Sequence, residues 1–245
     1  MGSKLEALAA RLKEARRVTA VTGAGVSAAS GVPTFRGPDG LWKSFRPEDL
    51  ATPATFDRDP GLVWEWYDWR RTLIAECRPN AAHKVLARWS RSHGLTLITQ
   101  NVDGLHELAG TRDVIRFHGS IWQLRCAASC GAGAWEDRCA PLTLIPPRCP
   151  RCGGLARPGV VWFGEAIDRA VLTRAEAALD CDVFLSIGTS SVVYPAAGLA
   201  HAARARGAFA AEINVAATDA AAVLDLAIAM PAEVALPLIG ELVGW

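Results

Sequence analysis

Four of the seven cysteines fall in two closely spaced pairs, Cys126-x3-Cys130 and, 19 residues further on, Cys149-x2-Cys152. Thiolates in two such pairs can close a tetrahedral shell around a zinc ion and leave no coordination position open for water. The spacing therefore predicts one structural Zn²⁺, which would stabilise a segment with little hydrophobic core of its own. The first pair is one residue wider than the common spacing, and Cys139 lies between the pairs. Cys139 could therefore replace Cys130 as a ligand.

Among the five histidines, His118 is the candidate for moving a proton during a reaction. It follows VIRF (114–117), a short apolar run typical of a buried strand, and open α/β sheets bind ligands at the carboxyl ends of their strands. Imidazole is the side chain best suited to proton transfer near neutral pH. The remaining histidines are interpreted as structural: His83, His93, His106 and His201.

A glycine-rich turn directly follows another apolar run, VTAVT (18–22). Gly23-x-Gly25-x-x-Ala28 fits the dinucleotide-binding pattern, in which glycines let backbone N–H groups and a helix N-terminus approach a pyrophosphate. A tight turn that merely needs small residues explains the same pattern. The next stretch, GVPTFRGPDGLW, is a loop sequence, whereas a dehydrogenase would show a second strand with an acidic residue for the ribose. Hydride transfer is therefore disfavoured.

A second polar turn, TQNVDGLH (99–106), follows the apolar run LTLIT (95–99). Gln100, Asn101 and Asp103 could hydrogen-bond the ribose and amide groups of a ligand at this strand end. The alternative is an Asn/Asp/Gly turn that only caps a helix.

A phenol and a guanidinium lie three residues apart in WEWYDWRR (64–71). On a helix, Tyr67 and Arg70 would share a face and could bind a small carboxylate, because the arginine fork is bidentate. A surface ion pair beside an aromatic core stripe of tryptophans explains these residues equally well. Without further context, that simpler interpretation is preferred.

Short apolar runs alternate with alanine-rich helical stretches along most of the chain. After a helix at about 4–16, the expected strands are 18–22, 95–99, 114–117, 183–188, 209–214 and 226–229. Buried strands separated by helices predict an α/β fold with a parallel sheet covered on both faces.

Two segments interrupt this alternation and are interpreted as inserts. The first, 37–79, carries Pro38, Pro47, Pro53 and Pro60 around the aromatic helix, and the second, 120–162, carries the paired cysteines. We expect a single catalytic region, 1–245, in two parts. The large domain takes about 1–36, 80–119 and 163–245, and the smaller domain consists of the helical insert 37–79 and the zinc module 120–162.

Composition sets the remaining bounds. The 245 residues are 51% hydrophobic and 21% charged, which is ample for a buried core and excludes a disordered chain. A net charge of +1 argues against a nucleic-acid partner, and no apolar run approaches the roughly 18 residues that span a membrane. The N-terminus has the pattern of an amphipathic helix rather than a secretory signal, so a cytoplasmic location is expected.

Taken together, GAGVSAASGVPTFRG, TQNVDGLH, FHGS, the paired cysteines, VVWFGE (160–165), GTS (188–190) and IN (213–214) resemble the sirtuin family of NAD-dependent protein lysine deacylases. The resemblance runs in the family's order from about residue 16 to 240. It implies a Rossmann-type large domain and a small domain built from a zinc module and a helical insert. NAD⁺ would lie between them, with an acyl-lysine protein or peptide entering across it. The oligomeric state stays open, and a monomer is compatible with the resemblance.

The resemblance also implies roles for individual positions. His118 would be the catalytic base, with Asn101 as the second catalytic residue. The implied NAD⁺ contacts are Gly23, Ala24, Gly25, Phe35, Arg36, Trp42, Gln100, Asn101, Val102, Asp103, Gly188, Thr189, Ser190, Asn214 and Ala232. A strand-like segment would pair with the substrate backbone through Val161, Phe163 and Glu165.

Within the family, Tyr67-x-x-Arg70 matches the signature of sirtuins that act on acidic acyl groups. Ala51, in DLATP, matches a small residue that widens their acyl pocket. A succinyl- or malonyl-lysine would then present its carboxylate to Tyr67 and Arg70, and the reaction would release nicotinamide and O-acyl-ADP-ribose.

Two alternatives remain at this point. Mono-ADP-ribosyl transfer would use the same NAD⁺ cleft but send the ribose to a protein nucleophile. A non-catalytic NAD-sensing module with a zinc-stapled surface would bind NAD⁺ without releasing nicotinamide.

Overall fold

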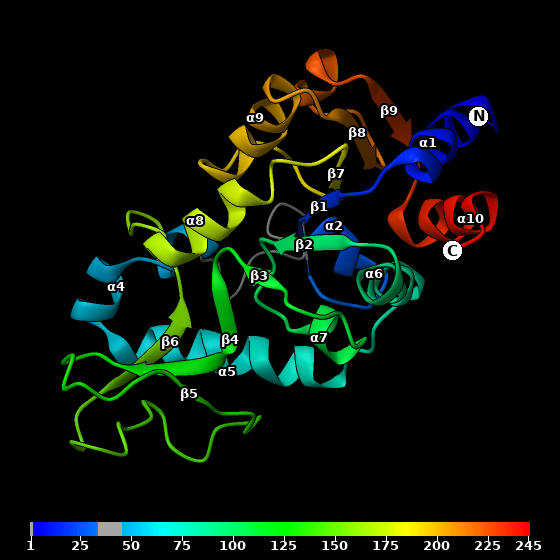
Figure 1. The fold of residues 1–245 in the computed structure, drawn as a ribbon. Helices are drawn as coiled ribbons and strands as arrows, with labels where there is room; N and C mark the ends of the chain where they lie inside the picture. Colours follow the sequence, from blue (N-terminus) through cyan, green and yellow to red (C-terminus); the bar gives the residue numbers. More distant parts are fainter. Residues whose placement is uncertain (1, 34–45) are drawn as a thin grey trace.

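The computed structural model describes residues 2–33 and 46–245, which form a six-stranded and a three-stranded sheet with surrounding helices (Figure 1). The elements are, in chain order, α1 (Gly2–Glu14), β1 (Val18–Thr22), α2 (Gly25–Ala28), α3 (Pro47–Leu50), α4 (Pro53–Arg58), α5 (Pro60–Glu76), α6 (Ala81–Ser92), β2 (Leu95–Thr99), α7 (Leu105–Leu108), β3 (Ile115–Arg116), β4 (Gly119–Cys126), β5 (Trp135–Glu136), β6 (Ala156–Val160), α8 (Arg169–Ala177), β7 (Val183–Ile187), the 3₁₀ turn Ala196–Gly198, α9 (Leu199–Ala205), β8 (Phe209–Asn214), the 3₁₀ turn Asp219–Val223, β9 (Leu226–Ala229) and α10 (Ala232–Val243).

The large sheet is parallel, in the order β3-β2-β1-β7-β8-β9. It contains all six strands expected from the apolar runs, so the predicted fold class is confirmed. Every residue of β1 is buried, as expected for a central strand covered on both faces. Ala20 packs with α1, α6 and α10, whereas its neighbour Val21 packs with α8 and α9 on the opposite face (Figure 1).

The smaller sheet is antiparallel, in the order β5-β4-β6, and α5 packs against it. One face of α5 holds this part together. The Trp64 indole donates to the Ala156 carbonyl at 2.8 Å, and the Asp68 carboxylate accepts from the backbone N–H of Leu142 at 2.6 Å. Arg71, which is fully buried, donates to the carbonyl of Cys139 at 2.9 Å and forms an ion pair with Asp137. These contacts fix the segment between the two cysteine pairs to α5.

The turns after β1 and β7 touch backbone to backbone. Gly25 donates its N–H to the Gly188 carbonyl at 2.8 Å, and a Cβ on Gly23 would lie 2.8 Å from that same oxygen. Gly188 has φ +59°, and a Cβ there would lie 2.5 Å from the backbone nitrogen of Val26. These glycines are therefore required by the contact between the two turns. Because the Gly25 N–H already has an acceptor, it is not available to a phosphate.

Gly188→Ala is expected to lower the free energy of unfolding by about 2 to 4 kcal/mol, because it adds both left-handed strain and a steric clash. Gly207 is the matched control, since it has φ +97° but nothing within 4 Å of its would-be Cβ. Gly207→Ala should cost only the strain, about 1–2 kcal/mol. Urea denaturation of both variants measures the difference, and equal losses would show that the contact between the turns contributes nothing.

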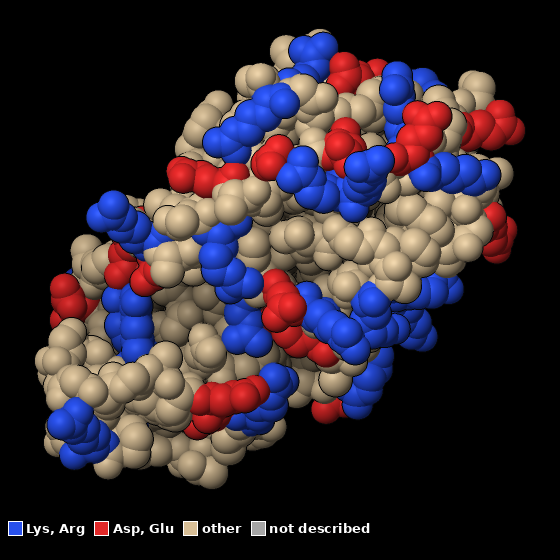
Figure 2. Space-filling view, viewed as in Figure 1, with Lys and Arg blue, Asp and Glu red and all other residues tan. Residues whose placement is uncertain are grey.

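The distribution of charged side chains and the lengths of the described helices agree with the composition. On the face shown in Figure 2, positive and negative side chains are interspersed, as expected for a net charge of +1. Among the described helices, none combines the length and apolarity that a membrane crossing requires.

Candidate functional site

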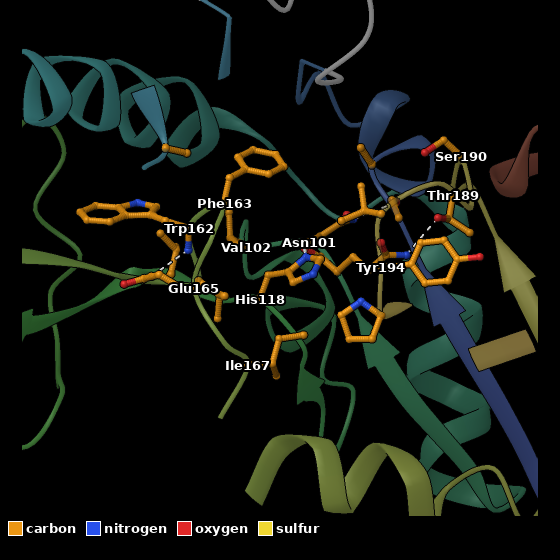
Figure 3. Close-up of a pocket in the computed structure, with 18 of the residues that line it drawn as sticks. Asn101, Val102, His118, Trp162, Phe163, Glu165, Ile167, Thr189, Ser190 and Tyr194 are labelled. Carbon is orange, nitrogen blue, oxygen red and sulfur yellow. Dashed lines mark hydrogen bonds between the residues drawn. The ribbon is translucent and has the colours of Figure 1, made fainter. Parts of the chain in front are cut away.

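A cavity of about 630 Å³ lies at the carboxyl ends of β1, β2, β7 and β8, between the large sheet and the part formed by α5 and β6. Figure 3 shows side chains from both parts of the molecule around it. The structure brings most of the predicted site residues to this cavity: Gly23, Ala24, Gly25, Ala51, Tyr67, Arg70, Gln100, Asn101, Val102, His118, Val161, Phe163, Glu165, Gly188, Thr189, Ser190 and Asn214.

Two predicted NAD⁺ contacts do not line the cavity. Asp103 is buried beside it, where its carboxylate accepts hydrogen bonds from the Ser27 hydroxyl at 2.7 Å and the Leu105 N–H at 2.8 Å. Burial raises the pKa of Asp103, although both hydrogen bonds oppose this. Ala232 is buried in the hydrophobic core at the start of α10. Three further predicted contacts lie outside the described residues: Phe35, Arg36 and Trp42.

His118 follows β3 and lines the cavity with its ring among residues from both parts (Figure 3). Its Nδ1 lies 3.2 Å from the carbonyl oxygen of Gln100. A carbonyl only accepts hydrogen bonds, so Nδ1 must carry the hydrogen and Nε2 keeps a free lone pair. Burial lowers the pKa of His118, and the bond to Gln100 offsets this in part. The imidazole is therefore neutral at neutral pH and able to accept a proton at Nε2.

Amide side chains join the turns at this edge of the large sheet. Gln100 Nε2 donates to the Thr189 hydroxyl at 2.9 Å, and Asn214 Nδ2 donates to the Thr189 carbonyl at 2.9 Å. Asn101 Nδ2 donates to the carbonyl of Gly23 at 3.0 Å. This set of hydroxyl, amide and backbone groups fits the sugars and the carboxamide of a dinucleotide, in a cavity of suitable size.

The other end of the cavity carries Tyr67 and Arg70, which share one face of α5. Tyr67 is buried, and burial raises its pKa to about 12, so its hydroxyl stays protonated. The Arg70 guanidinium lies over the Trp66 ring, 4.9 Å from the ring centre, and burial lowers the pKa of Arg70. Ala51 lines the same cavity. Tyr67 therefore belongs to a buried wall rather than to a surface ion pair.

The segment predicted as strand-like is not a strand, because β6 ends at Val160. A turn follows, in which Glu165 donates its N–H to the carbonyl of Trp162 at 3.0 Å. The Phe163 N–H is already donated to the carbonyl of Ala51 at 2.9 Å. The Glu165 carboxylate is held by Arg157 at 2.7 and 2.9 Å. Any pairing with a substrate backbone must therefore use the other main-chain groups of this turn.

Several lining residues were missed by the sequence analysis, above all Trp162 and Tyr194. Trp162 lies inside VVWFGE, between two residues predicted to contact the substrate, and it is only 2% exposed. Tyr194 is 79% exposed and follows the GTS turn closely, which is the one signal that could have indicated it.

The four predicted metal ligands form one cluster, with all sulfur atoms within 4.8 Å of one another. Cys126 and Cys152 are 3.6 Å apart, and Cys130 and Cys149 are 3.7 Å apart. Zinc–sulfur bonds of ~2.3 Å in a tetrahedron require sulfur–sulfur edges of about 3.8 Å, so the cluster fits Zn²⁺. Cys139 instead donates to the Pro141 carbonyl, so Cys130 completes the set. None of the four lines the cavity, which makes the site structural.

Comparisons with known proteins agree on one family. The model described as "Sir2 family" matches residues 23–195. The NAD-dependent protein deacylase of Aquifex aeolicus is 52% identical over 211 residues, which cover 85% of this chain and 87% of that protein. NAD-dependent protein deacylase 1 of Pseudomonas aeruginosa is 50% identical and covers 86% of this chain and 87% of its own length.

Solved structures agree as well. The crystal structure of a Sir2 homolog–NAD complex superposes with a TM-score of 0.91 at 45% identity, covering 97% of this chain and 93% of the other. A Sir2 variant with a deacetylated p53 peptide and 3'-O-acetyl ADP ribose has a TM-score of 0.87 at 27% identity, covering 97% and 98%.

Proposed function

This chain belongs to the Sir2 family and is an NAD-dependent protein lysine deacylase, and we propose that it removes succinyl and malonyl groups as well as acetyl groups. The observation that carries the proposal is the position of Tyr67 and Arg70, which line the same cavity as His118. A carboxylate at the end of an acyl chain would meet a guanidinium and a protonated phenol there.

NAD⁺, when bound, supplies the electrophilic ribose carbon and the nicotinamide leaving group. In our proposal, Gln100, Asn101 and Asn214 orient its sugars and carboxamide through the hydrogen-bonding groups at the strand ends. His118 Nε2 accepts a proton from a ribose hydroxyl, while the Gln100 carbonyl holds the ring in the required tautomer.

The acyl end of the cavity suits a charged group. Arg70 contributes the positive charge, and Tyr67 contributes a neutral donor because its pKa is about 12. Ala51 leaves room for a longer chain than acetyl. We further propose that Val161, Phe163 and Glu165, which line the cavity, contact the backbone of an acyl-lysine peptide. A Sir2 variant of the same fold has been solved with a deacetylated p53 peptide. We also propose that the chain is divided into the large and small domains whose bounds were predicted from the sequence.

An acyl-peptide panel tests the proposal directly. The protein is incubated with NAD⁺ and matched acetyl-, malonyl- and succinyl-peptides, and nicotinamide and the O-acyl-ADP-ribose product are measured. The proposal is supported if the malonyl and succinyl peptides are turned over at rates at least equal to the rate for the acetyl peptide. Turnover of the acetyl peptide alone would leave a deacylase without the acidic preference. ADP-ribose transfer to protein is not favoured, since the relatives described above are named deacylases.

The pH dependence of deacetylation reports on His118. Because burial places its folded-state pKa below the 6.5 of a free imidazole, the base should stay neutral, and kcat/KM should stay high, as the pH falls past 6.5. The acidic limb should therefore bend below pH 6.5, measured with an acetyl peptide, whose acyl group does not titrate. A bend above pH 6.5 would contradict the assignment.

The free energy of unfolding must be measured at the same pH values as kcat/KM. Burial holds the pKa of both His83 and His106 at about 3, whereas the unfolded chain binds protons below about 6.5. The stability contributed by the neutral rings is therefore complete above pH 6.5 and is lost as the pH falls towards 3.

A further inference from the structure

We propose that Trp162 is a positioning residue that selects acidic acyl groups by orienting the hydroxyl of Tyr67. The inference rests on the proposed function of the Tyr67 and Arg70 pair and extends it to a residue that contacts Tyr67 directly. Trp162 lies in the turn after β6, whereas Tyr67 lies on α5, and both line the cavity.

The direction of one hydrogen bond carries the argument. Trp162 Nε1 lies 2.9 Å from the Tyr67 hydroxyl oxygen, in a buried contact. An indole nitrogen only donates, so the phenol oxygen must accept in this pair. An oxygen that accepts from the indole N–H cannot turn its own hydrogen towards that N–H. The hydrogen of Tyr67 is therefore turned to the other side. Among residues 2–33 and 46–245, no side chain accepts a hydrogen bond from it.

The indole itself is held from several sides. The guanidinium of Arg157 lies over its ring, 3.5 Å from the ring centre, and the ring of Phe56 lies 5.2 Å away. Glu165 binds Arg157 with both carboxylate oxygens and also accepts the backbone N–H of Trp162 at 2.9 Å. Burial and these contacts leave the indole little freedom. A fixed donor can fix the hydroxyl that accepts from it.

The consequence concerns charged substrates alone. An acyl carboxylate has only acceptors, so it gains from a Tyr67 hydrogen that already points to it, together with the charge of Arg70. An acetyl group ends in a methyl group, which cannot accept this hydrogen bond. Trp162 should therefore improve binding of acidic acyl groups more than binding of the acetyl group.

The first test is Trp162→Phe, which keeps an aromatic ring but removes the N–H. We expect the KM for a succinyl peptide to rise about 2- to 10-fold, the range of one net hydrogen bond, with kcat nearly unchanged. The acetyl peptide makes no use of the oriented hydroxyl, so the succinyl-to-acetyl ratio of kcat/KM should fall. Equal changes on both peptides would overturn the proposal, because they would indicate a general structural effect.

The decisive test repeats Trp162→Phe in a Tyr67→Phe background. If Trp162 acts through the Tyr67 hydroxyl, the second substitution should add no further loss on the succinyl peptide. An additive loss would overturn the proposal. Should W162F not fold, W162H keeps a ring N–H that can donate: a succinyl-to-acetyl ratio of kcat/KM above that of Y67F supports the proposal, and a ratio equal to it contradicts the proposal.

Trp64→Phe is the matched control. Its indole N–H also makes a buried hydrogen bond, to Ala156, on the same helix, but Trp64 does not line the cavity. W64F should therefore lower thermal stability and leave the succinyl-to-acetyl ratio of kcat/KM unchanged.

The Tyr67→Phe and Trp162→Phe variants together distinguish a failure of this inference from a failure of the proposed function on which it rests. If Tyr67→Phe leaves the succinyl peptide unaffected, the acidic preference itself fails. If Tyr67→Phe affects it and Trp162→Phe does not, only the role of Trp162 fails.

Discussion

His118→Ala is expected to lower kcat/KM by about 10²- to 10⁴-fold on every acyl peptide, the usual cost of removing a general base. The reason is the position of Nε2, which faces the cavity without a hydrogen because Nδ1 is committed to Gln100. Nicotinamide release at saturating NAD⁺ and at peptide concentrations below KM measures the loss. The effect should be independent of the acyl group, since the proton comes from the sugar.

His201→Ala is the control for this variant, because His201 is exposed on α9 and does not line the cavity. Its kcat/KM should match wild type. NAD⁺ affinity of His118→Ala, measured by calorimetry, should remain within a few-fold of wild type. A variant that binds NAD⁺ and still turns over at the wild-type rate would remove His118 from the mechanism.

Arg70→Met is expected to separate the substrates. The succinyl peptide loses a charge-assisted hydrogen bond of about 1.5–3 kcal/mol, which corresponds to roughly a 10- to 150-fold fall in kcat/KM. The acetyl peptide has no charge to lose, so its kcat/KM should change by less than about threefold. Methionine keeps much of the length and apolar volume of the side chain, so the packing on Trp66 is largely retained.

Arg174→Met is the matched control, since Arg174 is exposed on α8 and does not line the cavity. It should change neither substrate. Rates measured at low and high salt add a second criterion, because screening should reduce only the advantage of the charged peptide. Equal losses on both peptides for Arg70→Met would contradict the proposed acyl recognition.

The strands of the large sheet could be predicted because each is a short apolar run, and these runs alternate with helical stretches along the chain. VTAVT and VFLSI are buried along their whole length. A continuous short apolar run of this kind is typical of a central strand in a parallel sheet. The zinc cluster was equally readable, since ligand spacing is a local property of the chain.

The smaller sheet was harder to predict. GSIWQLRC (β4) mixes polar, aromatic and small residues, and its partner β6 comes 30 residues later, beyond the cysteine segment. Pairing between strands that lie so far apart in the chain produces no periodic pattern in the sequence. Asp103 was placed at the cavity from its position in TQNVDGLH, but capping of Leu105 and the bond from Ser27 turn its carboxylate into the interior. Trp162 could not be predicted, because its partner Tyr67 is 95 residues away.

Helix α5 imposes a constraint on redesign. Its Trp64 and Arg71 anchor the segment that carries the metal cluster, while its Tyr67 and Arg70 face the cavity. Tilting or sliding this helix to admit a bulkier acyl chain would therefore strain the anchors and weaken retention of the metal. Variants with a broader acyl range should instead be sought on walls that α5 does not supply, starting at Ala51 and Phe163.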